Sequence, residues 1–378
     1  MKYYVISGEP SGDLHGSMLM SEIRKRDSNA IFRCWGGDLM QEQGAELVKH
    51  YKELAFMGFA EVLMNIRTIF KNLKFCKKDI LLFNPDALIL IDYPGFNMRI
   101  AEFAKSKGLK IFYYISPQIW AWHQSRGWKI KQLVDKMFVI LPFEKEFYKK
   151  FNLEVDFVGH PLLDAIEKFA AAKEPFGKFA ANNGLQQKPI ISLLPGSRTQ
   201  EINTMLPVML SVKKYFPEYQ FVIAGAPAIP PKIYKKYSAA EVPVLNGKTY
   251  ELLQHSTAAL VTSGTATLEA ALFEVPEIVC YKANFFSYHI ARQLVKVNFI
   301  SLVNLIMEKE ITGGQVVKEL IQHECNTANL QRELARILND KTYRGQMLDH
   351  YKMLRDKLGG PGASANTATI LLKTISGR

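Results

Sequence analysis

Three glycine-containing turns in this sequence have the residue types that bind phosphate groups. SGEPSGD (7–13), LLPGSR (193–198) and SGT (263–265) each come directly after an apolar segment and before a helical one. Glycines let backbone N–H groups approach an anion, and a helix that starts there directs its positive end toward it. The first turn is neither a G-x-G-x-x-G fingerprint nor a P-loop. These turns predict anion binding, with a plain strand-to-helix turn as the alternative for the first.

Polar residues in the second and third turns indicate a nucleotide diphosphate. Ser197 could cap the next helix, and Arg198 offers a fork of N–H donors to a diphosphate. Gly264 and Thr265 could form an anion nest, and Glu269, about a turn and a half later, could accept two hydrogen bonds from a ribose diol. The alternatives are an exposed surface arginine and a glutamate that stabilises a helix N-terminus.

Asp92 is a candidate general base. It ends the apolar segment 86–91 and precedes Pro94 and Gly95. Ligands of parallel sheets bind at the carboxyl ends of the strands, so a carboxylate there is well placed to remove a proton. A turn or capping aspartate is the commoner interpretation of such a residue in isolation. The nearby loop 114–126 adds aromatic faces that suit a sugar or pack in the core: Trp120, Trp122 and His123.

The sequence shows no D-x-D carboxylate pair and no His/Cys cluster with metal-ligand spacing. We therefore expect a metal-independent reaction in which positive charge and helix dipoles stabilise a leaving diphosphate. The four cysteines lie far apart, which is typical of reduced thiols in a cytosolic protein.

Strand-like and helical segments alternate along the chain, which predicts right-handed βαβ units and parallel sheets. The pattern restarts after a linker-like segment at 165–189, so we predict an α/β protein with two doubly wound, Rossmann-like domains and a ligand cleft between them. The expected domains are residues 1–170 and 185–344. The C-terminal helices, about 345–378, would pack back on the first domain or on a partner chain.

Net charge is +12, which suits a polyanionic partner. Between Glu61 and Asp79 the chain has no acidic residue, but it has five cations: Arg67, Lys71, Lys74, Lys77 and Lys78. Large apolar residues interleave with these cations, which a nucleic-acid surface rarely needs. The stretch 54–78 therefore indicates a membrane contact or an acyl-chain pocket, with a buried helix pair as the equal alternative.

The N-terminus has no apolar run long enough for a signal peptide, and no stretch approaches the ~18 apolar residues of a spanning helix. We therefore expect a protein that is neither exported nor integral to a membrane.

Motifs spread over nearly the whole chain resemble those of lipid-A-disaccharide synthases. They occur in the expected order: SGEPSGDLHG, MGFAEVL, IDYPGFN, YISPQIWAW, LPFE, GHP, LLPGSR, SGTATLE and SLVNL. The resemblance implies the GT-B fold. It also implies an inverting hexosyltransferase that moves 2,3-diacylglucosamine from UDP to the 6-hydroxyl of 2,3-diacylglucosamine 1-phosphate (lipid X). The products would be a β-1′,6-linked disaccharide 1-phosphate and UDP.

The resemblance also implies roles for single residues. Asp92 is the first candidate for the base, Asp13 the second and His15 a weaker third. Arg198 would hold the diphosphate, Glu269 the ribose, and Asn304 a further part of the donor. No cofactor is implied, since the UDP-sugar is a substrate. The implied location is the anionic inner face of the cytoplasmic membrane. A homodimer is possible, and the sequence does not decide the oligomeric state.

Other functions fit parts of this pattern. A UDP-N-acetylglucosamine 2-epimerase shares the two-domain fold but has no use for the apolar and basic stretch 54–78. A non-catalytic lipid-binding module would bind lipid without releasing UDP. A related glycosyltransferase would act on an undecaprenyl-linked sugar.

Overall fold

The computed structural model describes residues 1–54, 66–170, 174–227, 229–237, 242–283, 297–311 and 314–377. Contacts divide the chain into two units. Unit 1 contains Met1–Asp164 and Leu358–Arg378, and unit 2 contains Ala165–Lys357. The end of the chain therefore belongs to the same unit as its beginning. Within the described part, no helix is long and apolar enough to cross a membrane.

Unit 1 is built on a seven-stranded sheet whose strands are all parallel. The order is β3-β2-β1-β4-β5-β6-β7. The strands are β1 (Lys2–Ile6), β2 (Ile31–Gly36), β3 (Glu46–His50), β4 (Ala87–Ile91), β5 (Ile111–Tyr114), β6 (Lys136–Val139) and β7 (Asp156–Phe157). The central strands form because they are continuous apolar runs: every residue of β4 and β5 is buried.

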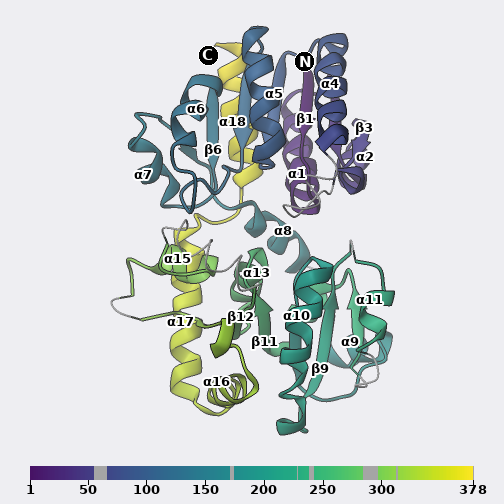
Figure 1. Ribbon diagram of the computed structural model, residues 1–378, viewed down its shortest axis with the longest axis vertical. Helices are drawn as coiled ribbons and strands as arrows, with labels where there is room; N and C mark the ends of the chain where they lie inside the picture. The colour runs from purple at the N-terminus through teal and green to yellow at the C-terminus, as the bar shows by residue number, and fades with distance from the viewer. Residues whose placement is uncertain are drawn as a thin grey trace. The chain divides into compact units, whose positions relative to one another are not determined.

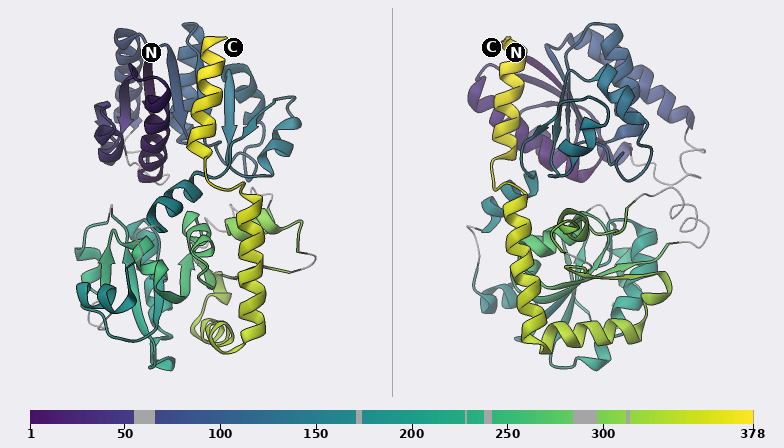
Figure 2. Two further views of the ribbon diagram at one scale, coloured as in Figure 1. Left: turned by 180° about the vertical axis from the view of Figure 1, so that it is seen from behind. Right: turned by 90° about the vertical axis from the view of Figure 1, so that its left-hand side faces the viewer.

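Helices cover both faces of this sheet (Figures 1 and 2). One face carries α1 (Pro10–Arg26) and α18 (Ala363–Ser376), and the other carries α4 (Ile66–Phe83), α5 (Pro94–Ser106) and α6 (Arg126–Leu133). The shorter helices are α2 (Asp38–Glu42), η1 (Tyr51–Glu53), α7 (Glu144–Lys149) and the start of α8 (Pro161–Ala170).

Asp164 fixes the return of the chain to unit 1. Its carboxylate accepts hydrogen bonds from the backbone N–H groups of Gly362, Ala363 (3.2 Å) and Ser364 (3.0 Å), at the start of α18. A carboxylate there satisfies N–H groups that have no partner inside the helix. The last helix is thereby joined to a residue about two hundred positions earlier in the sequence.

Unit 2 repeats the architecture with a six-stranded parallel sheet, in the order β10-β9-β8-β11-β12-β13. Its strands are β8 (Ile190–Leu194), β9 (Gln220–Gly225), β10 (Val244–Asn246), β11 (Ser256–Thr262), β12 (Glu277–Tyr281) and β13 (Lys318–Ile321). Its helices are α9 (Phe176–Asn182), α10 (Thr199–Leu210), η2 (Lys213–Tyr215), α11 (Lys232–Lys235), α12 (Thr249–Gln254), α13 (Thr265–Leu272), α15 (Leu302–Met307), η4 (Gln322–Glu324), α16 (Thr327–Asn339) and α17 (Lys341–Lys357). Two parallel-sheet α/β units confirm the predicted fold class.

The segment 165–189 differs from the linker that its composition predicts. It contains α9, whose Phe179 and Ala180 are fully buried in the core of unit 2 beside Leu252 and Val261. The glycines, prolines and asparagines that favour a linker lie mostly at the ends of this short helix. Unit 2 accordingly begins at Ala165, before the predicted boundary.

Candidate active site

In unit 1 the strand order reverses between β1 and β4, which lie side by side. The turns that follow these two strands therefore meet at one edge of the sheet. This switch point is where ligands of open α/β sheets bind. Gly8 is required there for packing: a Cβ on Gly8 would lie 2.5 Å from Cγ of Tyr93. The same holds for Gly12, where a Cβ would lie 2.8 Å from Cβ of Ser7.

Asp92 stands at this switch point in an unusual backbone conformation. Asp92 and Tyr93 have φ values of 43° and 50°, which costs about 1–3 kcal/mol for each non-glycine residue. Hydrogen bonds hold the turn: the Asp92 carbonyl accepts from Tyr113 Oη (2.6 Å) and from Asn97 Nδ2 (2.7 Å). The backbone of this turn is thus fixed by two side chains.

The surroundings of Asp92 favour its neutral, protonated form. Burial raises the pKa of Asp92 to about 7, the nearby Glu9 carboxylate adds to the rise, and the Tyr93 backbone N–H opposes it. A carboxylate with a pKa near 7 is ionised in part at physiological pH and binds a proton well. These are the properties of a general base.

Glu9 is a second carboxylate at the switch point, to which sequence reasoning gave no role. It occupies the position before α1, is partly exposed, and its charge raises the pKa of both Asp92 and Tyr93. The sequence does place Glu9 in the SGEPSGD turn. The order of the strands, which brings this turn to Asp92, cannot be read from the sequence.

Asp13 has a structural role, contrary to the expectation that it is the second candidate base. It is buried, and its carboxylate accepts hydrogen bonds from the backbone N–H groups of Gly37 (2.8 Å), Leu39 (3.1 Å) and Met40 (3.1 Å). Both oxygens are therefore occupied in holding the turn between β2 and α2.

His15 lies in α1, and the carboxylate that acts on it is that of Asp164 and not that of Asp92. Burial lowers the pKa of His15 to about 4, and the Asp164 carboxylate opposes this change. Its neighbour His160 is buried too, with a pKa lowered to about 3 by burial and by His15. His15 is therefore neutral at physiological pH and, with so low a pKa, a weak base.

In unit 2 the strand order reverses between β8 and β11, so the LLPGSR and SGT turns share one edge of the sheet. Glu201 shapes the first turn. Its carboxylate accepts from the backbone N–H groups of Ser197 (3.1 Å) and Arg198 (3.3 Å) and from Arg198 Nη1 (3.2 Å). Gly196, with φ of 111°, allows this approach. The N-cap position of α10 is held by Arg198 and not by Ser197, and Glu201 reaches back from the first turn of the helix.

The Arg198 side chain is 56% exposed, so its guanidinium keeps donors for a ligand beyond the bond to Glu201. Close by in the fold, α13 begins at Thr265 without a side-chain cap, and Gly264 has φ of 154° with open space at its Cβ position. Both Gly264 and Thr265 are exposed. An uncapped helix N-terminus and a nearby arginine make a suitable site for a diphosphate.

Glu269 lies on the same helix, in a partly buried position. Burial raises the pKa of Glu269 to about 7, and Tyr250 Oη donates to Glu269 Oε1 at 3.5 Å. The Tyr250 ring packs against Phe169 and Phe273, which fixes its hydroxyl. Glu269 is thus positioned by the fold and retains one oxygen for a ligand hydroxyl.

Asn304 does not have free groups for a donor sugar, which corrects the expected role. Its Nδ2 donates to the carbonyl of Val317 (2.9 Å) and to Glu319 Oε1 (2.8 Å). Its Oδ1 accepts from the backbone N–H groups of Val316 (2.9 Å) and Val317 (3.1 Å). Because the side chain is buried and fully hydrogen-bonded, Asn304 joins α15 to the segment that leads into β13.

Comparison with known proteins decides the family. A family model described as lipid-A-disaccharide synthetase matches residues 3–370. Lipid-A-disaccharide synthases of Syntrophus aciditrophicus and Geobacter metallireducens are 38% and 37% identical over 98% of this chain, and cover 97% and 96% of their own lengths. The synthase of Coxiella burnetii is 35% identical over 98% of both chains. This chain belongs to the lipid-A-disaccharide synthase family.

Solved structures with little sequence identity share the fold. A UDP-GlcNAc 2-epimerase from Neisseria meningitidis aligns with a TM-score of 0.67 at 14% identity, covering all of both chains. The glycosyltransferase of kitacinnamycin gives 0.65 at 13% identity over 99% of each chain. These similarities confirm the GT-B type of fold, and the family makes this chain a glycosyltransferase.

Two family motifs place further polar groups near the carboxyl end of β5. In SPQIWAW, Trp120 is buried against Phe143, whereas Trp122 is 47% exposed with Arg126 above its ring. In LPFE, Glu144 is buried, and it accepts from the backbone N–H groups of Ile140 (3.2 Å) and Leu141 (2.9 Å). Burial raises the pKa of Glu144 to about 7. Of the two tryptophans, Trp122 is the exposed one, and its ring also contacts His123.

Proposed function

We propose that this enzyme transfers 2,3-diacylglucosamine from UDP-2,3-diacylglucosamine to the 6-hydroxyl of 2,3-diacylglucosamine 1-phosphate. The products are the β-1′,6-linked disaccharide 1-phosphate and UDP. The observation that carries this proposal is Asp92, a carboxylate with a pKa near 7 at the switch point of unit 1, in a chain of this family.

Asp92 removes the proton from the acceptor hydroxyl as the oxygen attacks the anomeric carbon of the donor. The new C–O bond forms on the face opposite UDP, the bond to the diphosphate breaks, and the configuration inverts. The proton remains on Asp92 until water removes it. Raising the pKa of Asp92 favours this step because proton transfer is best driven when the base has a pKa near the working pH.

Unit 2 stabilises the leaving UDP. Its negative charge grows as the glycosidic bond breaks, and Arg198 and the uncapped N-terminus of α13 offer donors and positive charge to the diphosphate. Glu269 binds the ribose through the carboxylate oxygen that Tyr250 leaves free. We propose that these groups replace a metal ion, so the reaction proceeds without one.

The exposed side of α4 is the proposed membrane contact. Its apolar side chains Phe70, Phe75 and Leu82 are 60%, 47% and 75% exposed, and lysines lie among them on the same side: Lys71, Lys74 and Lys78. The other side is buried through Leu73, Cys76 and Ile80. Apolar groups beside lysines are typical of helices that lie on anionic membranes. The part of the stretch 54–78 at 55–65 lies outside the described residues.

The test is mass spectrometry of the products formed from UDP-2,3-diacylglucosamine with and without the 1-phosphate acceptor. We expect the disaccharide 1-phosphate and UDP, in equal amounts, only when both substrates are present. A 2-epimerised sugar formed from the donor alone would support an epimerase, and lipid binding without UDP release would support a non-catalytic module. Either result would contradict the proposed transfer.

A further inference from the structure

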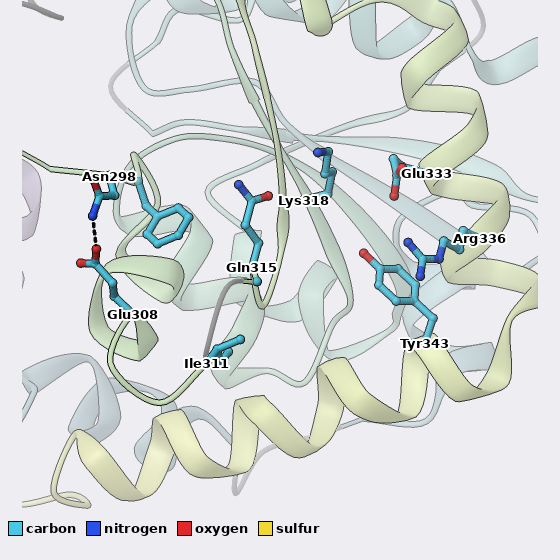
Figure 3. A pocket seen from close by; sticks show the side chains of 10 residues that line it. Asn298, Glu308, Ile311, Gln315, Lys318, Glu333, Arg336 and Tyr343 are labelled. Atoms are coloured by element: carbon cyan, nitrogen blue, oxygen red, sulfur yellow. Dashed lines mark hydrogen bonds between the residues drawn. The ribbon is translucent and has the colours of Figure 1, made fainter.

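A cavity of about 690 Å³ lies in unit 2 beside the edge strand β13. Figure 3 shows its lining, which comes from the chain around residue 298, the chain around residue 315, β13, and the corner between α16 and α17. This volume is within the range of about 300–1,000 Å³ that small-molecule sites occupy. None of the proposed donor-binding residues lines it.

The cavity is separate from the proposed diphosphate site. Lys318, at the amino end of β13, pairs with Ile278 of β12, and Ile278 pairs with Leu260 of β11. Gly264 is four residues beyond Leu260 toward the carboxyl end, which is about 13 Å along the strands, and β11 is two strands away, about 10 Å across the sheet. A ligand in this cavity therefore does not use the Arg198 and α13 groups.

Among the described residues, neither of the two cations that line the cavity has a carboxylate partner. Arg336 is stacked on Tyr343, with Cζ 3.7 Å from the ring centroid, and the partly buried Lys318 lies on the adjacent wall (Figure 3). Stacking fixes the guanidinium plane, so its N–H donors are oriented before a ligand binds. In unit 2 the ion pairs among the described residues involve other cations: Arg198, Arg332, Lys352 and Lys357.

The two carboxylates of the lining do have partners. Glu308 accepts a hydrogen bond from Asn298 Nδ2. Glu333 is buried, with Arg332 Nε at 3.7 Å. Asn298 is neutral, so Glu308 keeps its charge, whereas Glu333 is paired with Arg332. The two cations Lys318 and Arg336 therefore exceed the one carboxylate without a cation partner, and the positive balance favours an anionic ligand.

We propose that this cavity binds a phosphate ester. Lys318 and Arg336 would hold the phosphate oxygens through charge-assisted hydrogen bonds. Gln315 adds donors, since its Oε1 accepts from the Glu319 N–H (3.2 Å) and leaves the NH₂ group for the ligand. Phe299 and Ile311 line the cavity as well and cover an apolar part of the ligand. A lipid headgroup and a soluble phosphate ester share this chemistry.

Isothermal titration calorimetry of the full chain, with and without saturating UDP, tests the proposal. The probes are sn-glycerol 3-phosphate and monomeric dihexanoyl phosphatidic acid. We expect binding in both conditions, and a loss of at least about tenfold in affinity for Lys318→Gln and for Arg336→Gln. Lys214→Gln, which makes the same change of charge at an exposed position of unit 2 outside the cavity, should bind like the unchanged protein. Unchanged UDP affinity in each variant shows that unit 2 is folded.

Tighter binding of the phosphatidic acid identifies a lipid headgroup site, and equal binding of the two probes identifies a site for soluble esters. Either result supports the proposal. Three results would overturn it: no binding of either probe, displacement of the probes by UDP, or an equal loss of affinity in Lys214→Gln. Failure of UDP itself to bind would count against the proposed function and not against this cavity.

Discussion

At the residue scale, burial and a neighbouring charge act in the same direction on Asp92. The carboxylate is partly removed from water, and Glu9 places a second negative charge near it, so the pKa of Asp92 rises to about 7. Each effect disfavours the ionised form. Activity that depends on ionised Asp92 should therefore rise with pH through neutrality.

Replacing Glu9 tests this pairing. In Glu9→Gln the negative charge is lost, so we expect the pKa of Asp92 to fall and the acidic limb of the kcat/KM profile to move to lower pH. The measurement is kcat/KM as a function of pH, which reports groups of the free enzyme. Glu9→Asp keeps the charge and serves as the control. An acidic limb that stays in place in Glu9→Gln would contradict electrostatic coupling of the two carboxylates.

Glu277 is a buried carboxyl group outside the proposed site. Among the described residues neither of its oxygens has a hydrogen-bond partner, and burial and Glu319 raise its pKa well above 4.5. In the unfolded chain Glu277 ionises near its ordinary pKa, whereas in the folded chain it stays protonated. The stability that Glu277 gives is therefore complete below about pH 4.5 and is lost as the pH rises.

We expect Glu277→Gln to be more stable to unfolding than the unchanged protein at pH 8, because Gln is neutral without having to bind a proton in the folded chain. The difference should vanish near pH 4. Urea unfolding at both pH values is the measurement. Glu319→Gln is the matched variant: Glu319 accepts from Ile300 N (3.0 Å) and Ser301 N (3.0 Å), so its loss should destabilise. Equal stability of the unchanged protein and Glu277→Gln at pH 8 would contradict this account.

At the element scale, α4 has two faces with different roles. Asn72, Leu73, Cys76 and Ile80 pack inward, and the outward residues alternate between lysine and large apolar side chains. For the stretch 54–78, the sequence predicted a membrane contact or acyl-chain pocket and a buried helix pair as equal alternatives. The described part of α4 is one helix that is buried along one side only.

Charge reversal of Lys71, Lys74 and Lys78 to Glu should weaken binding to anionic vesicles by at least about tenfold, since each lysine near such a surface contributes about 1 kcal/mol. Vesicle sedimentation measures this. The control reverses three exposed lysines at α7 and its C-cap, in the same unit: Lys145, Lys149 and Lys150. Equal losses in both triple variants would show a general effect of net charge and would remove α4 as the contact.

Sequence patterns predicted the buried central strands well, because continuous apolar runs such as 86–91 are typical of strands that are buried on both faces. Short edge strands were harder: β3 is only partly buried and β13 begins with Lys318 and Glu319, so neither has an apolar run. The structural roles of Asp13 and Asn304 could not be predicted from the sequence for a related reason. Their partners are backbone groups at residues 37–40 and 316–317, and such contacts exist only after folding.

At the scale of the whole molecule, two similar units have different charges at their switch points. Unit 1 presents carboxylates there, Glu9 and Asp92, and unit 2 presents Arg198 and an uncapped helix. Because the strand order reverses in the same way in both sheets, this difference comes from the residues that follow the strands, and it divides the proposed work between a base and a diphosphate site. The sequence predicted Asp92, Arg198 and Gly264 from their positions after strands, and Glu269 from its place on the following helix. The structure has Asp92, Arg198 and Gly264 in the turns after β4, β8 and β11 and Glu269 in α13, and the roles of all four stay predictions.

Arg198→Gln should raise the Kd for UDP at least about tenfold, because a charge-assisted hydrogen bond contributes about 1.5–3 kcal/mol. Lys214→Gln, which removes an exposed cation elsewhere in unit 2, should leave the Kd unchanged. Adding EDTA should change neither UDP affinity nor turnover. Calorimetry with UDP and a coupled UDP-release assay are the measurements, and loss of activity in EDTA would contradict a metal-independent reaction.

The most direct test of Asp92 as the base compares turnover and UDP affinity in Asp92→Asn, with Asp349→Asn, an exposed carboxylate of α17, as the control. We predict that Asp92→Asn lowers kcat at least about 100-fold, the usual scale for removal of a general base, while the Kd for UDP stays the same. Turnover within a few fold of the control would show that another group takes the proton.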